Sequence, residues 1–152
     1  MRCQVTSIIR IKEAATILAF ASLAAADDEG GRIHADIVSL RSDGGNALCA
    51  LFSSADAFPT KPDQAIRLVQ SPILNHRAAC DFVDIAPGTY AISVTHDANG
   101  NGKLDRNLLG MPTEGVGASN DARGVVGPPK FDAAKFTFDG GSLTLTITVR
   151  YL

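Results

Sequence analysis

The chain contains 152 residues, which is enough for one domain with a hydrophobic core. It carries 14 Lys and Arg residues against 16 Asp and Glu residues, and this formal net charge of −2 argues against nucleic acid or an anionic membrane as a partner. Aromatic residues make up only 6% of the chain and Trp is absent, which disfavours a carbohydrate-binding platform of stacked rings.

The N-terminus has the composition of a secretory signal peptide. Three basic residues precede an apolar run from Ala14 to Ala26, and the run ends in a cleavage pattern of three small residues. We assign residues 1–26 to a signal peptide and residues 27–31 to a flexible lead-in, and we expect an exported protein that is periplasmic or secreted. A retained membrane anchor is the alternative, although the run is short for a membrane span.

Cleavage after Ala26 would remove three basic residues and one acid from the totals of 14 and 16. The remaining 126 residues would carry 11 basic and 15 acidic side chains, a net charge near −4. They contain no second long apolar segment, so no transmembrane segment is expected in the mature chain.

Two cysteines, Cys49 and Cys80, follow the signal peptide. In an exported protein a pair of this kind predicts a disulfide, and both residues lie in strand-like runs with apolar neighbours two positions away. The bridge would close a loop of about 30 residues and stabilise the fold by roughly 3 kcal/mol. Two reduced, buried thiols are the alternative.

Alternating apolar and polar residues predict a series of strands with no long helix among them. The expected strands span residues 32–40, 47–53, 67–74, 77–85, 89–96, 134–138 and 142–151, with a short helical turn at 62–65. We expect the first two strands to form an antiparallel hairpin through the turn at 42–46, and the last two to form another through 139–141. The predicted fold class is all-β, an antiparallel β-sandwich of about seven strands that occupies residues 32–152.

A segment of 33 residues between His96 and Lys130 has no strand period. Compact domains rarely contain so long a loop unless it is functional, so we place the function in loop 97–129.

This loop begins with oxygen-bearing residues at alternate positions, a spacing that suits Ca²⁺. The expected ligands are four side chains and one carbonyl, from Asp97, Asn99, Asn101, Asp105 and Lys103 respectively. Three further candidate ligands follow in the loop: Asn107, Glu114 and Asp121. Position 12 is Leu108 rather than the bidentate Glu of an EF-hand, so such a site would be weak and structural. A tight turn in which Asp97 and Asp105 accept backbone N–H groups is the alternative.

His96 is the residue at the loop mouth that most invites a catalytic interpretation. Its position in the strand pattern matches the inward-facing Ile92 and Val94, which favours a hydrogen-bonded structural histidine. No Ser or Cys nucleophile motif accompanies His96, and Glu114 has no identifiable second acid–base group. We therefore assign no catalytic residue.

Several motifs occur in a fixed order: Gly45–Phe52, Pro87–Ala91, His96–Asp105, Leu109–Gly115, Ser119–Ala122 and Gly127–Phe131. This string resembles an uncharacterised exported bacterial group, the domain-of-unknown-function family 2141, over essentially the whole chain after the signal peptide. The resemblance implies an immunoglobulin-like or prealbumin-like β-sandwich outside the cytoplasm. It brings no established activity.

The sequence thus favours an exported, non-enzymatic binding or structural module of the cell envelope, with an unknown protein or envelope component as partner. Two alternatives stay open. One is a cell-envelope hydrolase that uses His96, Asp97 and Glu114. The other is a carrier for a small apolar ligand, which would require a sizeable internal cavity.

Overall fold

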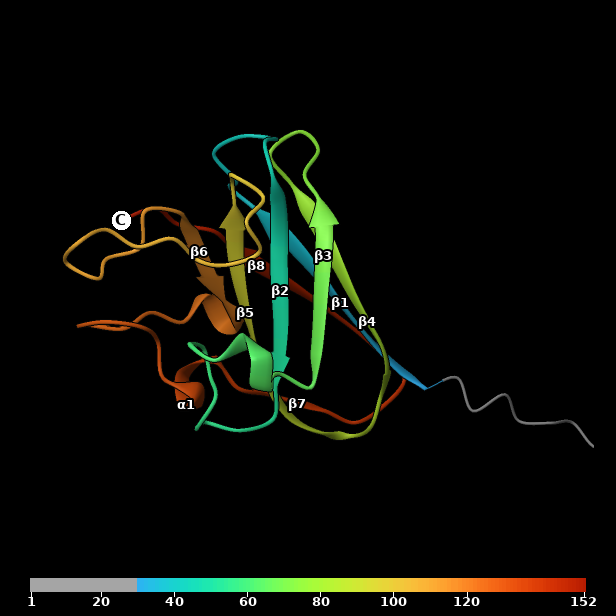
Figure 1. The fold of residues 1–152 in the computed structure, drawn as a ribbon. Helices are drawn as coiled ribbons and strands as arrows, with labels where there is room; N and C mark the ends of the chain where they lie inside the picture. The colour runs from blue at the N-terminus through green and yellow to red at the C-terminus, as the bar shows by residue number, and fades with distance from the viewer. Residues whose placement is uncertain (1–29) are drawn as a thin grey trace, which may run out of the picture.

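The computed structural model describes residues 30–152, and these form eight strands in two facing sheets (Figure 1). The signal-peptide assignment and most of the expected lead-in lie outside the described residues. One sheet has the order β4-β1-β8, from Ala78–Ile85, Gly31–Val38 and Ser142–Thr148. The other has the order β3-β2-β5-β6, from Arg67–Pro72, Asn46–Phe52, Gly88–Asp97 and Gly115–Ala118, and β7 (Phe136–Phe138) also pairs with β5. The predicted all-β sandwich is confirmed.

The core lies between the two sheets and follows the predicted alternation. In β1, Ile33, Ala35 and Ile37 are fully buried, whereas the residues between them reach the surface. From the facing sheet, Leu51 and Ile92 are equally buried. Because each buried Ile or Leu side chain contributes roughly 1.5–3 kcal/mol, this apolar layer is the main source of stability.

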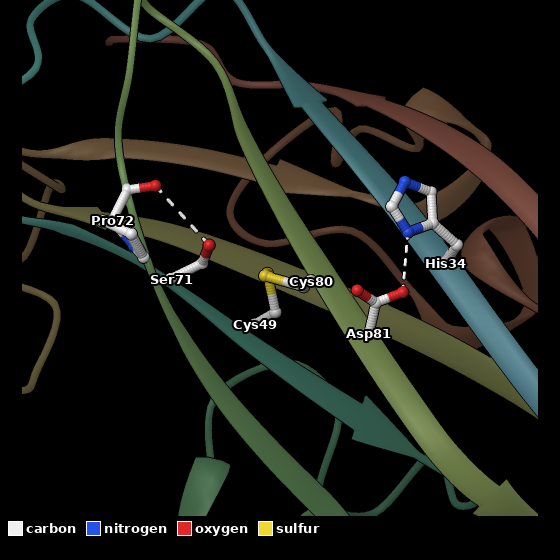
Figure 2. Close-up of a disulfide and its surroundings, with 6 residues drawn as sticks. All are labelled: His34, Cys49, Ser71, Pro72, Cys80 and Asp81. Atoms are coloured by element: carbon white, nitrogen blue, oxygen red, sulfur yellow. Dashed lines mark hydrogen bonds and ion pairs between the residues drawn. A yellow bond between two sulfur atoms is a disulfide. The ribbon is translucent and has the colours of Figure 1, made fainter.

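The Cys49–Cys80 disulfide crosses this core and joins β2 to β4 (Figure 2). Both sulfur-bearing residues are completely buried, and their Cα atoms are 6.4 Å apart. The predicted bridge is therefore confirmed, and it links the two sheets directly.

The two expected hairpins are wrong. β1 and β2 lie in different sheets, because the segment that joins them binds the turn after β3 instead of folding back. The Asp43 carboxylate accepts the backbone N–H groups of Asn75 (3.0 Å) and His76 (2.7 Å).

The second expected hairpin is absent because β7 pairs with β5, whereas β8 runs parallel to β1. The alternating pattern defines which face of a strand is buried, but not which strand lies beside it.

A second, smaller apolar cluster covers the outer face of β2 and β5. The rings of Phe52 and Phe58 pack edge to face with centroids 5.5 Å apart, and Phe131 adds a similar contact to Phe58 at 5.9 Å. Phe131 begins the short helix α1 (Phe131–Ala134), and the expected helical turn η1 (Pro62–Gln64) follows Phe58 in the chain. The cluster anchors the segments on both sides of loop 97–129.

Loop 97–129 contains regular structure, whereas the sequence predicts no strand there. Strand β6 lies inside it and pairs antiparallel with β5 from Ser93 to His96. A 3₁₀ turn, η2 (Ser119–Asp121), follows directly. Strand β6 divides the loop into two arms, residues 98–114 and 122–130, which project from the same side of the sandwich (Figure 1).

Candidate functional site

Asp97 ends β5 and forms the base of the first arm. Its side chain is 1% exposed, and its two carboxylate oxygens accept the backbone N–H groups of Asn101 (3.0 Å) and Gly102 (2.8 Å). Gly100 and Gly102 have φ values of 73° and 78°, a region that glycine adopts without strain. The Asp-Ala-Asn-Gly-Asn-Gly segment is therefore wound tightly around one buried carboxylate.

Asp105 closes this turn through the two asparagines. The amide nitrogens of Asn99 and Asn101 donate to its carboxylate oxygens at 2.6 and 2.8 Å. The amide oxygens of the same residues accept the backbone N–H groups of Asn101 (3.1 Å) and Lys103 (3.0 Å). The structure thus brings together all five residues expected to bind the cation, in a network of side-chain and backbone hydrogen bonds.

Glu114 joins the two ends of the Asp97–Asp105 segment. Its carboxylate oxygens accept the backbone N–H of Ala98 at 2.9 Å and that of Asp105 at 3.0 Å. The residue is 8% exposed, so these hydrogen bonds are shielded from water. Among the three additional residues considered as ligands, Glu114 is the one that reaches the Asp97–Asp105 segment.

The other two additional residues act elsewhere. Asn107 stabilises its own turn, because its side-chain oxygen accepts the N–H groups of Leu109 (2.9 Å) and Met111 (3.0 Å). Asp121 accepts the backbone N–H of Thr148 at 2.8 Å and the hydroxyl of the same residue at 3.1 Å. Within residues 30–152, no three His, Cys, Asp or Glu side chains assemble as a metal-binding group.

His96 points into the core, as its position in the strand predicts, and is 1% exposed. Its Nε2 lies 2.8 Å from the carbonyl oxygen of Gly44, and its Nδ1 lies 2.6 Å from the Tyr151 hydroxyl. Both ring nitrogens therefore have a partner within the protein.

The Ser119-Asn120-Asp121 motif ties the second arm to three elements. The Ser119 hydroxyl accepts the backbone N–H of Ile92 (2.9 Å) in β5 and donates to the carbonyl of Ala134 (2.6 Å) in α1. Asn120 has a positive φ of 59° and donates to the carbonyl of Lys135 at 2.9 Å. Together with the bonds of Asp121 to β8, this motif fixes the point at which the second arm leaves the sheet.

A groove with a volume of about 800 Å³ lies between the two arms, over β6. Its wall contains apolar residues of both arms and the arginines Arg106, Arg123 and Arg150. Sequence reasoning did not single out these arginines, because they lie 17 and 27 positions apart and the first two stand in a segment without strand period. The fold brings them to one groove, because the first arm, the second arm and the chain after β8 line it together.

A separate polar cluster lies on the outer face of the first sheet. The His34 Nδ1 is 2.7 Å from the Asp81 carboxylate, to which Arg32 also donates at 3.1 Å (Figure 2 shows the His34–Asp81 contact). The Asp81 hydrogen bond raises the pKa of His34 above its ordinary 6.5. The same bond, with help from Arg32, lowers the pKa of Asp81 below 3.8. The cluster lies on the β1–β4 face, away from the loop arms that extend from β6.

The protein is thus an all-β sandwich whose two sheets are joined by a disulfide and whose one long loop is held by hydrogen bonds. The chain belongs to the DUF2141 family, described as an uncharacterized protein conserved in bacteria, whose family model matches residues 36–146. This match contains both disulfide cysteines and the whole of loop 97–129. No curated protein and no solved structure gives a significant match. Among the residues that the structure describes, there is no helix with the length and apolar character needed to cross a membrane.

Proposed function

We propose that this chain is an exported, non-enzymatic binding module of the cell envelope and that loop 97–129 is its binding surface. The observation that carries the proposal is a concentration of exposed apolar side chains on this loop. Five of the ten exposed large apolar residues within residues 30–152 lie there: Leu108, Leu109, Met111, Val125 and Val126. Apolar side chains that gather on one part of a surface mark an interaction site.

The bracing of the loop supports the same proposal. Asp97 and Glu114 are buried carboxylates, and together they accept four backbone N–H groups of the first arm. Charge-assisted hydrogen bonds of this kind are stronger than neutral ones. A loop held in this way loses little conformational entropy when a partner binds, and this favours binding.

The hydrolase alternative has less support. A general acid or base must reach the substrate with a free nitrogen or oxygen. The side chains of His96, Asp97 and Glu114 are each 8% exposed or less, and all of their titratable atoms have partners within the protein. These contacts favour a structural role for the three residues.

The buried Cys49–Cys80 bridge supports export, because disulfides persist mainly in oxidising compartments. Export and cleavage after Ala26 predict a periplasmic or extracellular product that begins at Asp27. Mass spectrometry of the protein isolated from fractionated bacteria measures this. A product that keeps residues 1–26 in the cytoplasmic fraction would contradict this part of the proposal.

Weak, structural Ca²⁺ binding at the start of the loop belongs to the proposal as well. The amide groups of Asn99 and Asn101 already direct partial positive charge at the Asp105 carboxylate. A cation at Asp105 would replace those two hydrogen bonds, so its net gain would be small and its affinity low. Thermal unfolding in millimolar Ca²⁺, in millimolar Mg²⁺ and in excess chelator tests the idea. We expect a midpoint raised by Ca²⁺ in the parent but not in Asp105→Asn; an unchanged midpoint in the parent removes Ca²⁺ from the proposal.

The binding surface itself is tested by photo-crosslinking in living bacteria. Benzoyl-phenylalanine is placed at Leu108 or Val125 in the loop, or at Leu74 or Val83 as exposed apolar controls elsewhere. We expect discrete crosslinked products from the loop positions alone. Equal yields from the loop and control positions would show that the loop is not the binding surface.

A further inference from the structure

The groove between the two arms has the size and lining of a small-molecule site. Its floor is formed by β6, and its walls come from the first arm, the second arm and the chain that follows β8. A volume of about 800 Å³ falls within the range of roughly 300–1,000 Å³ that is usual for such sites. The apolar side chains that line it include Leu104, Met111, Pro112, Val116, Val125 and Pro129.

The charge of the groove is opposite to that of the chain as a whole. Arg106, Arg123 and Arg150 line it, whereas Asp121 is the one acidic residue in the wall that residues 30–152 form. The Asp121 carboxylate is already engaged by Thr148. The whole chain, in contrast, has a net charge of −2.

Within the described part of the chain, no carboxylate forms an ion pair with these arginines. The ion pairs within residues 30–152 use Arg32, His34 and Lys135 as their positive partners, so none includes an arginine of the groove. Arg106 donates one hydrogen bond, at 3.0 Å, to the carbonyl of Gly110. A guanidinium offers five N–H donors and suits the two oxygens of a carboxylate, so each has donors to spare.

We propose that the groove binds small amphipathic acids, with the apolar chain along β6 and the anionic head between Arg123 and Arg150. This inference rests on the proposed function, because it names the ligand class of the same loop. A neutral ligand would leave the arginines without an anionic partner, and a cationic one would be repelled. An acidic protein segment is the competing occupant, and the test separates the two.

Isothermal titration calorimetry compares three probes that share a ten-carbon chain and differ in head group: decanoate, 1-decanol and decyltrimethylammonium, each below its micelle concentration. The full chain is expressed in bacteria, and the protein is purified from them without further truncation. The variants are Arg123→Gln, Arg150→Gln and the double variant, with Arg67→Gln as the matched control. Arg67 is an exposed arginine on β3, at the other edge of the same sheet.

We expect saturable one-to-one binding of decanoate and about tenfold weaker binding of decanol, the effect of losing a charge-assisted hydrogen bond. The double variant should bind decanoate only as well as decanol, with its decanol affinity unchanged, whereas Arg67→Gln should match the parent. Amide spectra of each variant confirm that it is folded.

Two results would overturn the inference: no saturable binding of decanoate, or equal affinities for decanoate and decanol. Either result combined with loop-specific crosslinks in bacteria would leave the proposed binding surface intact and point to an acidic protein segment. Loss of the loop-specific crosslinks would instead contradict the proposed function itself.

Discussion

The Tyr151 hydroxyl lies 2.6 Å from Nδ1 of His96 and joins the end of β5 to the chain that follows β8. The other ring nitrogen, Nε2, faces the Gly44 carbonyl oxygen, which can only accept a hydrogen bond. Nε2 therefore carries a hydrogen, and in the neutral ring Nδ1 accepts from the Tyr151 hydroxyl. That hydroxyl in turn accepts the backbone N–H of Arg41 at 2.7 Å.

The first prediction concerns this chain of hydrogen bonds. Tyr151→Phe leaves the buried Nδ1 of His96 without its donor, so we expect a loss of about 1–3 kcal/mol in the free energy of unfolding, measured in urea. Tyr90→Phe serves as comparison and should cost less, because its hydroxyl makes a single bond to the Ala86 carbonyl, which water can replace. Nitrogen-15 spectra of the parent should show the Nε2–H tautomer of His96; the opposite tautomer would contradict this assignment.

Glu114 is the subject of the second prediction. Glu114→Gln keeps one acceptor but places an NH₂ group against a backbone N–H, so one of the two hydrogen bonds to Ala98 and Asp105 is lost. We expect a destabilisation of about 1–3 kcal/mol, together with faster hydrogen exchange at those two amides. Asp139→Asn, which alters an exposed acid in a turn, should leave both quantities unchanged. Unchanged exchange in Glu114→Gln would show that the carboxylate does not brace the loop.

Most of the strands could be predicted from the sequence, because the alternation of apolar and polar residues indicates which side chains are buried. Ile33, Ala35 and Ile37 face the core as that pattern requires. The partners of the strands were less predictable. The placement of β1 and β2 in different sheets depends on hydrogen bonds from Asp43 to a turn more than 30 residues away, and no local pattern encodes such a contact.

Strand β6 was missed because two of its four residues are Gly115 and Gly117. Glycine has no side chain to alternate and is unusual inside strands. The tight turn at Asp97–Asp105 could be anticipated, since Asp, Asn and Gly together favour such a turn, whereas the Ca²⁺ ligands inferred from the same spacing stay a prediction. The groove could not be predicted, because its arginines come from the two arms and from the chain after β8, and only the fold places these segments around one groove.

A third prediction follows from the disulfide. Replacing Cys49 and Cys80 together by Ala should lower the free energy of unfolding by roughly 3 kcal/mol, because the unfolded chain is no longer constrained by the 31-residue separation that the bridge spans. Urea unfolding of both forms without reductant measures the difference. Because both residues are fully buried, the parent should resist reduction until it unfolds. Rapid reduction under native conditions would contradict the interior position of the bridge.

The fourth prediction concerns the pH dependence of stability. The His34–Asp81 bond raises the pKa of His34 above 6.5, so the stability from charged His34 is fully present below that pH and is lost as pH rises through the raised pKa. The same bond lowers the pKa of Asp81 below 3.8, so the stability from its carboxylate is present above that pH and is lost as pH falls through the lowered pKa. Both contributions to stability are therefore fully present between pH 3.8 and pH 6.5, the ordinary pKa values of the two side chains.

The destabilisation caused by His34→Gln should accordingly be largest near pH 5 and should shrink above pH 7. Because the two side chains are 30% and 37% exposed, we expect no more than about 1 kcal/mol. Urea unfolding of the parent and the variant across this range measures the difference. Asp63→Asn, at an exposed position in η1, provides a control without this profile. A destabilisation that is constant with pH would show that the pair does not carry the effect.

The fifth prediction tests the close approach of β6 to the end of the chain. A Cβ atom at Gly115 would lie 2.6 Å from the Tyr151 ring and from a methyl carbon of Val149, and both neighbours are packed in the core. Gly115→Ala should therefore cost about 1–3 kcal/mol in urea unfolding, as overpacking of a dense interior does. Gly44→Ala is the matched substitution, because the nearest atom to a Cβ there lies 3.6 Å away, and it should be close to neutral. Equal stabilities of the two variants would mean that β6 moves away from Tyr151 without loss, so that the groove floor is not rigid.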